Sequence, residues 1–224
     1  MIDRRSFLAR TATATTAASI APQRLLLAGD EKRPIERELV GEFVTKSHFD
    51  FDVVKALLEK EPALINAAWD WGNGDWETGL GAASHVGRPE IANLILDHGA
   101  RIDIFAATML GHAKIVQAFL DAIPEIHRVP GPHGIPLLSH AIVGRDTAAD
   151  IVELLINRGA DLNAKSLLGM TPLMAAAAIG RVEAIDLLLA RGADPTLVDA
   201  KSQSALDWAE SRGHQAAAQR LRAG

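Results

Sequence analysis

Apolar residues recur at helical spacing in paired short segments along the chain, and a glycine follows each segment. The clearest pair lies in residues 169–194, where Gly180 separates the two segments and Gly192 follows the second. This spacing predicts two helices, each of which presents one apolar face and ends where glycine can adopt a left-handed conformation. The apolar positions are Leu173, Ala176 and Ala177 in the first helix, and Ile185, Leu188 and Leu189 in the second.

The start of the first of these helices is marked by Thr171 and Pro172. A threonine hydroxyl can accept a hydrogen bond from a backbone N–H of the first turn. Proline suits the first helical position because the N–H that it lacks would have no partner within the helix. The sequence therefore predicts that Thr171 caps a helix whose first residue is Pro172.

The paired pattern repeats along the chain with a period of 33 residues. Gly180 and Gly213 are 33 positions apart, and so are Gly159 and Gly192. A single pair of short helices cannot bury its own apolar face, so neighbouring pairs must cover one another. The pattern therefore predicts a stacked array of helix pairs. Related segments lie at residues 76–100, 102–120, 135–163 and 202–224.

The segments TPLMAAAAIG and AIDLLLARGAD, together with the 33-residue period, resemble ankyrin repeats. The resemblance covers about residues 40–222 and implies an all-α, ankyrin-like solenoid of stacked helix-turn-helix repeats. It also implies a non-catalytic module that binds other proteins. The histidine that usually follows Thr-Pro-Leu in the family is replaced here by Met174, Leu138 or Gly81, so we expect less regular repeats.

The first 28 residues have the pattern of an export signal. Arg4 and Arg5 precede Phe7 and Leu8, and a short uncharged stretch rich in Ala and Thr follows. This order resembles a twin-arginine signal, which implies export to a bacterial periplasm; an ordinary secretory signal or a retained amphipathic helix are the alternatives. The predicted organisation is an export signal peptide at 1–28, a linker at 29–34, a degenerate N-terminal repeat or cap at 35–66, and about five repeats with a C-terminal cap at 67–224.

Charge and composition narrow the range of partners. The formal net charge is -5, and removal of residues 1–28 makes it more negative because they contain four Arg and one Asp. An acidic chain is poorly suited to nucleic acid or to an anionic membrane surface. Cysteine is absent, which excludes disulfides and thiolate zinc sites. We expect no cofactor, no membrane association after removal of the signal, and a monomer.

Two long connections carry the candidate binding residues. Residues 61–77 and 123–135 are predicted to be long loops. In contrast, the connection from Gly99 to Ile102 is too short to form a finger, which is the projecting loop that joins one helix pair to the next. The two loops would begin about 20 Å apart with a notch between them, because stacked helices lie about 8 to 10 Å apart. The residues predicted to line this notch are Trp69, Asp70, Trp71, Asn73, Asp75 and Trp76, opposite His133.

Such a patch combines aromatic area with carboxylates, which suits a cationic, sugar-like or peptide ligand. The alternative is that the three Trp rings fill the space left by the missing finger, since large aromatic residues often serve in packing. Asp70, Asn73 and Asp75 weakly resemble a calcium loop, but the residues between them break the spacing of its oxygen ligands.

The remaining residues form no recognisable catalytic or metal-binding motif. Seven of the eight histidines show no i, i+4 pair and no His-Glu-x-x-His spacing, so no metal site is predicted. His140 is expected to be a hydrogen-bonded core histidine. Adjacent Ser84 and His85 would point in different directions on a helix, so we predict that the protein is not an enzyme. The seven histidines are His85, His98, His112, His127, His133, His140 and His214.

These observations predict an exported ankyrin-like protein that binds an unidentified protein or peptide in the periplasm. The alternative is a small-molecule binder, for a sugar or a cationic ligand, or a weak enzyme that uses the Trp-rich loop 69–76 and His133. A third interpretation is a module that protects or inhibits an exported enzyme. No catalytic residue is predicted.

Overall fold

The structure is a computed structural model that describes residues 33–144 and 149–223 of the 224-residue chain. The chain divides into two units, residues 1–34 and residues 35–224. The predicted signal peptide at 1–28 and most of the predicted linker at 29–34 lie outside the described residues. Among the helices of the described ranges, none is long and apolar enough to cross a membrane.

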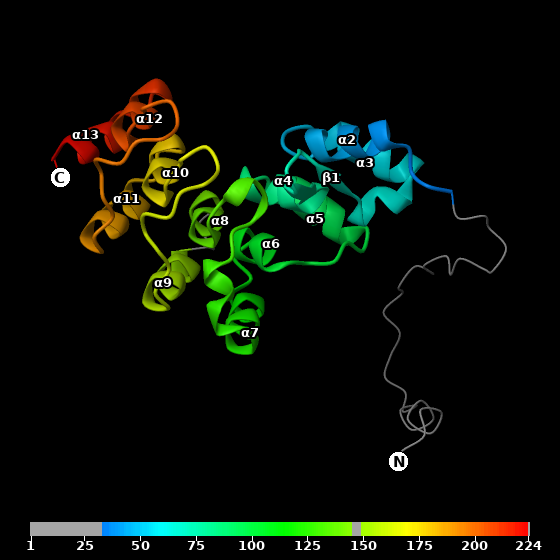
Figure 1. Cartoon of the computed structure of the whole chain (residues 1–224), viewed down its shortest axis with the longest axis horizontal. Coiled ribbons are helices and arrows are strands. Elements are labelled where there is room, and N and C mark those ends of the chain that lie inside the picture. Colours follow the sequence, from blue (N-terminus) through cyan, green and yellow to red (C-terminus); the bar gives the residue numbers. More distant parts are fainter. Residues whose placement is uncertain (1–32, 145–148, 224) are drawn as a thin grey trace, which may run out of the picture. The chain divides into compact units, whose positions relative to one another are not determined.

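Residues 35–224 form pairs of short helices, which confirms the predicted stack of helix-turn-helix units. Figure 1 shows the pairs following one another in sequence order. The first helix of each pair contacts the first helix of the next pair. These first helices are α4 (Gly79–His85), α6 (Ile104–Met109), α8 (Leu137–Val143), α10 (Pro172–Ala178) and α12 (Ala205–Ser211). The second helices are α5 (Pro89–Asp97), α7 (Ala113–Ala122), α9 (Ala149–Asn157), α11 (Val182–Ala190) and α13 (Gln215–Ala223).

Two further helices precede these pairs, α2 (Arg37–Lys46) and α3 (Phe51–Lys60). They contact each other, and α2 also contacts α4. Phe43 of α2 and Leu58 of α3 are buried in the same apolar cluster as Leu80 of α4. The core of the repeats therefore continues into this segment.

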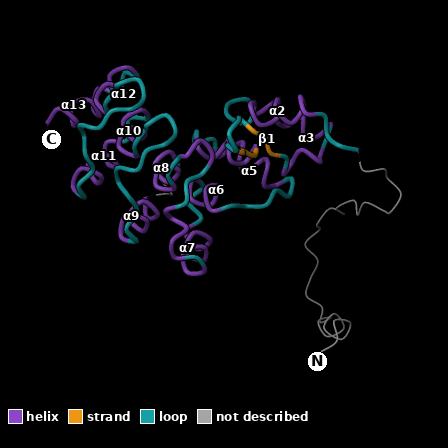
Figure 2. Tube along the Cα trace, viewed as in Figure 1, coloured by secondary structure: helices purple, strands orange, loops and turns teal. Residues whose placement is uncertain are grey.

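Residues 61–77, predicted to be a long loop, instead form a short 3-10 turn, η1 (Pro62–Asn66), and a β-hairpin (Figure 2). Gly72, Asn73 and Gly74 all have positive φ angles, which is the backbone conformation that a tight hairpin turn requires. The hairpin is the only sheet among the described residues. Its antiparallel strands are β1 (Ala68–Asp70) and β2 (Trp76–Thr78).

Side-chain caps fix where the first helices begin. Thr171 accepts a hydrogen bond from the backbone N–H of Met174 at 3.3 Å, and α10 begins at Pro172, as predicted. Thr78 caps α4 and Asp103 caps α6 in the same way. These caps satisfy N–H groups that have no partner inside the helix. The local sequence therefore determines where each of these helices begins.

The connection between α5 and α6 is short, as the sequence predicted. α5 ends at Asp97 and α6 begins at Ile104, so no finger projects between them. As a result α4 contacts α8 directly, in addition to α6. The loop before α8 contains two 3-10 turns, η2 (Pro124–Arg128) and η3 (Pro132–Gly134), and η3 also contacts α4. The missing finger thus brings the segments before α4 and before α8 together.

The buried pair Ser84 and His140 joins α4 to α8. Ser84 Oγ and His140 Nδ1 are 2.9 Å apart, and neither residue has exposed surface. This confirms the prediction that His140 is a hydrogen-bonded core histidine. Burial, with a smaller effect of the charge of His85, lowers the pKa of His140 to about 3. The ring is therefore neutral in the folded protein over the physiological range.

Glycine at position 87 is required by its conformation and by its surroundings. Gly87 has a φ of +71°, and a Cβ there would lie 2.5 Å from the backbone oxygen of Val143, whereas Gly192, at φ +97°, faces open space. We expect Gly192→Ala to lower the free energy of unfolding by about 1 kcal/mol. Gly87→Ala should lower it by about 3 kcal/mol or more, because α8 must move. Urea denaturation followed by circular dichroism measures both, and equal losses would contradict the close packing at Gly87.

Acidification should destabilise the protein through His140. The unfolded chain binds a proton there near pH 6.5 and the folded chain near pH 3, so the stabilisation by the neutral ring is complete above pH 6.5 and is lost as the pH falls toward 3. Between pH 6.5 and 4.5, wild type should lose about 2 to 3 kcal/mol more than His140→Asn, whose amide does not titrate. Chemical denaturation at both pH values measures this difference. Equal losses would mean that another group is responsible.

Candidate functional site

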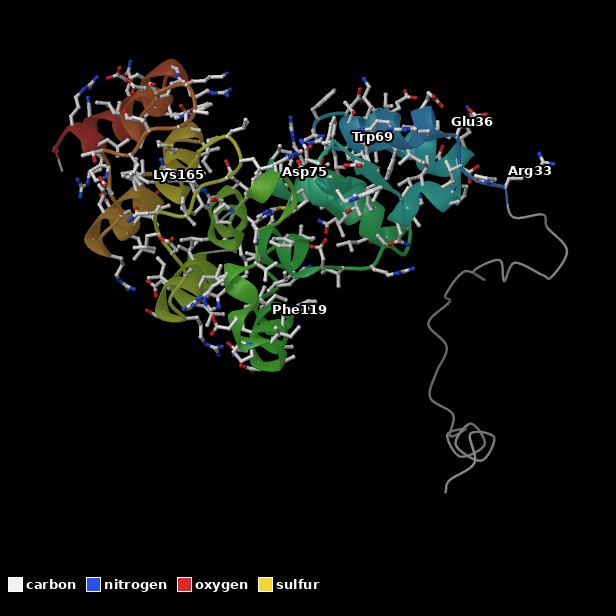
Figure 3. The ribbon with its side chains drawn as sticks, viewed as in Figure 1. Arg33, Glu36, Trp69, Asp75, Phe119 and Lys165 are labelled. Carbon is white, nitrogen blue, oxygen red and sulfur yellow. The ribbon has the colours of Figure 1, made fainter. Side chains whose placement is uncertain are left out.

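The predicted site residue Trp69 packs against α2 (Figure 3). The guanidinium of Arg37 lies over the Trp69 ring, 5.1 Å from its centroid. A Cβ at Gly41 would lie 3.0 Å from the same ring. The indole of Trp69 is half-buried and contributes to packing, so it is not a free binding surface.

The other two tryptophans of the hairpin are at the surface. Trp76 is 60% exposed and Trp71 is 42% exposed. Trp71 Nε1 donates a hydrogen bond to Oε2 of Glu77 at 2.9 Å, and the Trp71 ring lies 5.8 Å from that of His133. The three rings therefore serve different purposes: one packs, one orients a buried carboxylate, and one is open to solvent.

Asp75 and His133 are in direct contact. Asp75 accepts hydrogen bonds from the backbone N–H of His133 at 2.8 Å and from its Nδ1 at 2.7 Å. The predicted open notch between the hairpin and the loop before α8 is therefore wrong, because the two segments meet. The cause is the missing finger, which lets α4 and α8 touch and brings the preceding segments together. Asp75 is labelled at this junction in Figure 3.

Asp70 and Asn73 shape the hairpin turn. Asp70 Oδ1 accepts a hydrogen bond from the backbone N–H of Gly72 at 2.9 Å. Asn73 is exposed and has a φ of +55°, a conformation that asparagine tolerates better than most residues. The structure thus assigns Asp70 and Asn73 to the turn, and it brings Trp71 and Asp75 together with His133.

Glu77 is the centre of a group of histidines that we call the Glu77 cluster: His48, Glu77, His85 and His133. The Glu77 side chain is fully buried. Nε2 of His48 and Nε2 of His133 lie 3.5 Å and 3.4 Å from its Oε2, and Nδ1 of His85 lies 3.0 Å from its Oε1. One nitrogen or oxygen atom from each of the four residues lies within 4.8 Å of the others. Such an arrangement could hold a metal ion.

Hydrogen bonds and charges keep the two carboxylates of this region ionised. Burial raises the pKa of Glu77, but the contact and charge of His85 and the charge of His48, together with the Trp71 N–H, lower it below its usual value. Burial likewise raises the pKa of Asp75, and the N–H groups and charge of His133 outweigh this effect. Burial lowers the pKa of His48 by more than Glu77 raises it. An ionised Glu77 therefore faces a neutral His48 near pH 7.

The sequence prediction did not include His48, Glu77 or His85. They come from the turn after α2, from β2 and from the last turn of α4, whereas tests of metal-ligand spacing compare residues that are close in sequence. One signal was available, since Glu77 follows Trp76 in a strand and must point to the opposite face. A glutamate on a buried face needs partners, which the sequence alone does not identify.

The tips of the loops that precede α8, α10 and α12 are joined by backbone hydrogen bonds. The N–H of Leu167 donates to the carbonyl of His133 at 2.9 Å, and the N–H of Ala200 donates to the carbonyl of Leu168 at 2.9 Å. We call residues 129–135, 165–169 and 198–202 the loop edge. Its exposed apolar side chains are Val129, Leu167, Leu168 and Val198. Exposed apolar side chains on mutually bonded loops are typical of a surface that contacts another molecule.

A hollow of about 620 Å³ lies beside the loop edge. It is lined by parts of the loop before α8 and of the loop before α10, and its charged lining residues are Arg128, Asp161 and Lys165. A second hollow, of about 570 Å³, is lined by residues of α8, α9 and α11 and of the turn before α11. Neither of these two hollows includes a tryptophan, so they offer space away from the Trp-rich hairpin.

Comparison with known proteins identifies relatives of the repeats. Residues 138–224 match the family model described as ankyrin repeats (3 copies). The chain is 30% identical over 176 residues to "Ankyrin repeat protein nuc-2" of Neurospora crassa, a match that covers 75% of this chain and 16% of that protein. It is 35% identical over 109 residues to "Ankyrin repeat and SAM domain-containing protein 6" of Rattus norvegicus, which covers 48% of this chain and 12% of that protein. The chain thus spans about a sixth or less of the length of these relatives.

Proposed function

Because the chain is an ankyrin repeat protein, we propose that it is an exported interaction module whose loop edge binds a segment of a partner protein. The family match and the stacked helix pairs support the ankyrin solenoid that the sequence predicted. Ankyrin repeats are typically binding scaffolds without enzymatic activity. A fold alone does not fix a function, so the binding surface has to be argued from the residues themselves.

The loop edge is the observation that carries this proposal. Leu167 and Leu168 are each 68% exposed, and backbone hydrogen bonds tie their loop to the loops on either side. A surface that is already ordered loses little conformational entropy when a partner binds. The adjacent hollow offers an apolar and charged recess for a partner side chain. We therefore infer a partner segment that presents apolar side chains.

The Trp-rich hairpin supports the alternative, a small-molecule site, less well. Trp69 packs against α2, and Trp71 is hydrogen-bonded to Glu77. Trp76 remains as an open aromatic face, but it lines neither of the two hollows described above. A ligand pocket usually combines several convergent groups around a concave space. We therefore place partner binding at the loop edge and not at the hairpin.

Export rests on the N-terminal sequence. Arg4 and Arg5, followed by Phe7 and Leu8, resemble a twin-arginine signal, and an apolar stretch follows. The absence of cysteine from the whole chain is compatible with an oxidising compartment. We propose that the repeats act in the periplasm on a partner found there.

Replacement of Leu167 and Leu168 together by Asp tests the binding surface. Both side chains are largely exposed, so the fold should be retained, and burial of a leucine in an interface contributes about 1 to 2 kcal/mol. We expect the double variant to bind the partner about 30-fold more weakly or worse. The partner is captured on wild type from periplasmic extract and then titrated against each purified protein by calorimetry.

Ile115→Asp is the matched control, because Ile115 is a partly exposed apolar residue on α7, outside the loop edge. It should leave the affinity unchanged. Equal affinity of wild type and the double variant, or an equal loss in Ile115→Asp, would contradict the loop edge as the binding surface.

Exchange of both Arg4 and Arg5 for Lys tests export. The positive charge is kept, but lysine lacks the planar guanidinium of arginine, so recognition of an arginine pair should fail. We expect the variant to stay in the cytoplasm in cell fractionation followed by immunoblotting. Arg10→Lys, outside the pair, should be exported like wild type. Normal export of the Arg4, Arg5 variant would exclude a twin-arginine signal.

A further inference from the structure

The Glu77 cluster contains more histidines than an ion pair requires. Three imidazoles from three separate segments surround one buried carboxylate, with ring centroids 4.9 Å apart for His48 and His85 and 5.1 Å apart for His85 and His133. A single protonated histidine would neutralise Glu77. The other rings therefore need a different explanation.

The orientation of His48 gives the first indication. Its Nδ1 lies 3.1 Å from the carbonyl oxygen of Val44 and 3.0 Å from that of Thr45. A carbonyl oxygen only accepts hydrogen bonds, so Nδ1 carries a proton. In the neutral ring Nε2 then has a free lone pair, and this lone pair faces Oε2 of Glu77 at 3.5 Å. In this neutral form two acceptors face each other, and either a second proton on the ring or a metal ion between them would remove the repulsion.

His133 repeats this arrangement. Its Nδ1 is 2.7 Å from Oδ2 of Asp75, which accepts a hydrogen bond, so Nδ1 again carries the proton. Its Nε2 points at Oε2 of Glu77 at 3.4 Å. His133 is also held at a φ of +57°, a region that residues other than glycine rarely adopt. Strain of this kind persists where the surrounding contacts fix a side chain for a purpose.

Two buried atoms at the centre of the cluster lack a hydrogen-bond partner among the described residues. They are Oε1 of Glu77 and Nδ1 of His85. The two atoms are 3.0 Å apart, within the distance of an ion pair, but they form no hydrogen bond. A buried polar atom without a partner is costly and often marks an ion that binds there. One of these atoms belongs to the carboxylate and the other to one of the three imidazoles around it.

We propose that His48, Glu77, His85 and His133 bind one divalent transition-metal ion, and that this ion is Zn²⁺. Tetrahedral zinc with bonds of about 2.0 Å separates its ligand atoms by about 3.3 Å. The contacts of Glu77 with these histidines measure 3.0 Å from Oε1 and 3.4 and 3.5 Å from Oε2, and the four ligand atoms lie within 4.8 Å of one another, so they would draw slightly closer around the ion. Three imidazoles favour zinc, copper or nickel over the oxygen-seeking Mg²⁺ and Ca²⁺. Without an ion, the lone pairs of the histidine nitrogens and of the Glu77 carboxylate repel one another. With the ion bound, the same lone pairs become its ligands.

The residues around the cluster fit a metal centre as well. Histidine ligands usually donate their second N–H to a carboxylate or a backbone carbonyl, which is what Asp75 and Val44 accept. The Trp71 N–H holds Oε2 of Glu77. Asp75 and Glu77 together carry two negative charges, which balance the charge of one divalent ion. These hydrogen bonds from and to the surrounding residues would orient the ligands before the ion binds.

A metal ion with four protein ligands has no open coordination position, which is typical of a structural site. The ion would tie the turn after α2, the hairpin, the end of α4 and η3 to one point, and such binding adds directly to the stability of the fold. The side chains of His48 and His133 are 20% and 28% exposed, so an ion can reach the cluster from solvent. His133 belongs both to this cluster and to the loop edge, but the two sites differ in chemistry, since the cluster would bind an ion and the loop edge a protein.

His133→Asn tests the site, with the full chain purified without a histidine tag and stripped by a chelator. Asparagine tolerates a positive φ and can donate to Asp75, but it lacks the nitrogen that faces Glu77. Wild type should bind one Zn²⁺ per chain with a Kd below about 1 μM, measured by competition with a chromophoric chelator. Bound Co²⁺ should give the visible absorption bands of a tetrahedral site. His133→Asn should bind at least about 100-fold more weakly, and Asp75→Asn about 10 to 100-fold more weakly.

His98→Asn is the matched control. His98 also contacts the carbonyl four residues before it through Nδ1, at 2.8 Å from Leu94, but it lies outside the cluster. It should bind Zn²⁺ like wild type. A saturating excess of Zn²⁺ should raise the Tm of wild type and of His98→Asn by about 5 °C or more, and leave that of His133→Asn unchanged.

Failure of wild type to bind one Zn²⁺ per chain would overturn the proposal and leave protonated histidines as the explanation of the cluster. Equal affinity of wild type and His133→Asn would overturn it too. If circular dichroism shows that His133→Asn does not fold, His48→Asn is the second variant. It keeps a donor for Val44 and removes the nitrogen that faces Glu77, so the same loss of affinity is expected.

Discussion

The stacking of each helix pair on its neighbours is the interaction on which the rest of the structure depends. The first helices have only six or seven residues, too few to be stable in isolation. Ala82, Ala107 and Ala176 lie on these helices without exposed surface, and their small side chains let consecutive helices approach closely. The conformation of one pair is therefore supplied largely by the pairs on either side.

The absence of one finger changes what this stacking places together. With six residues between α5 and α6, α4 reaches α8, and Ser84 bonds His140 across the contact. The hairpin before α4 and the turn η3 before α8 then lie side by side, which creates the bonds between Asp75 and His133. A regular finger would separate these segments. The Glu77 cluster is thus a consequence of an irregular repeat.

Local features of the fold could be predicted from the sequence, and the convergence of distant residues could not. The cap at Thr171 and the buried position of His140 follow from the residues nearby and from the repeat period, and both are confirmed. The hairpin at 68–78 forms on the local turn at Gly72, Asn73 and Gly74, a signal that the loop prediction did not use, whereas the cluster around Glu77 depends on how the missing finger lets α4 and α8 meet. Spacing along the chain contains no record of that contact, so His48 and His85 gave no signal before the fold was known.

His133 links the two regions on which the proposals rest. Its ring contacts Asp75 and Glu77, and its carbonyl oxygen accepts the N–H of Leu167 in the loop edge. A residue that is fixed at its side chain cannot rotate freely at its backbone, so order in the Glu77 cluster restricts the loop that presents Leu167. Less freedom in that loop before binding means a smaller entropic cost when a partner orders it. The cluster would therefore support the binding surface by holding it in place before the partner binds.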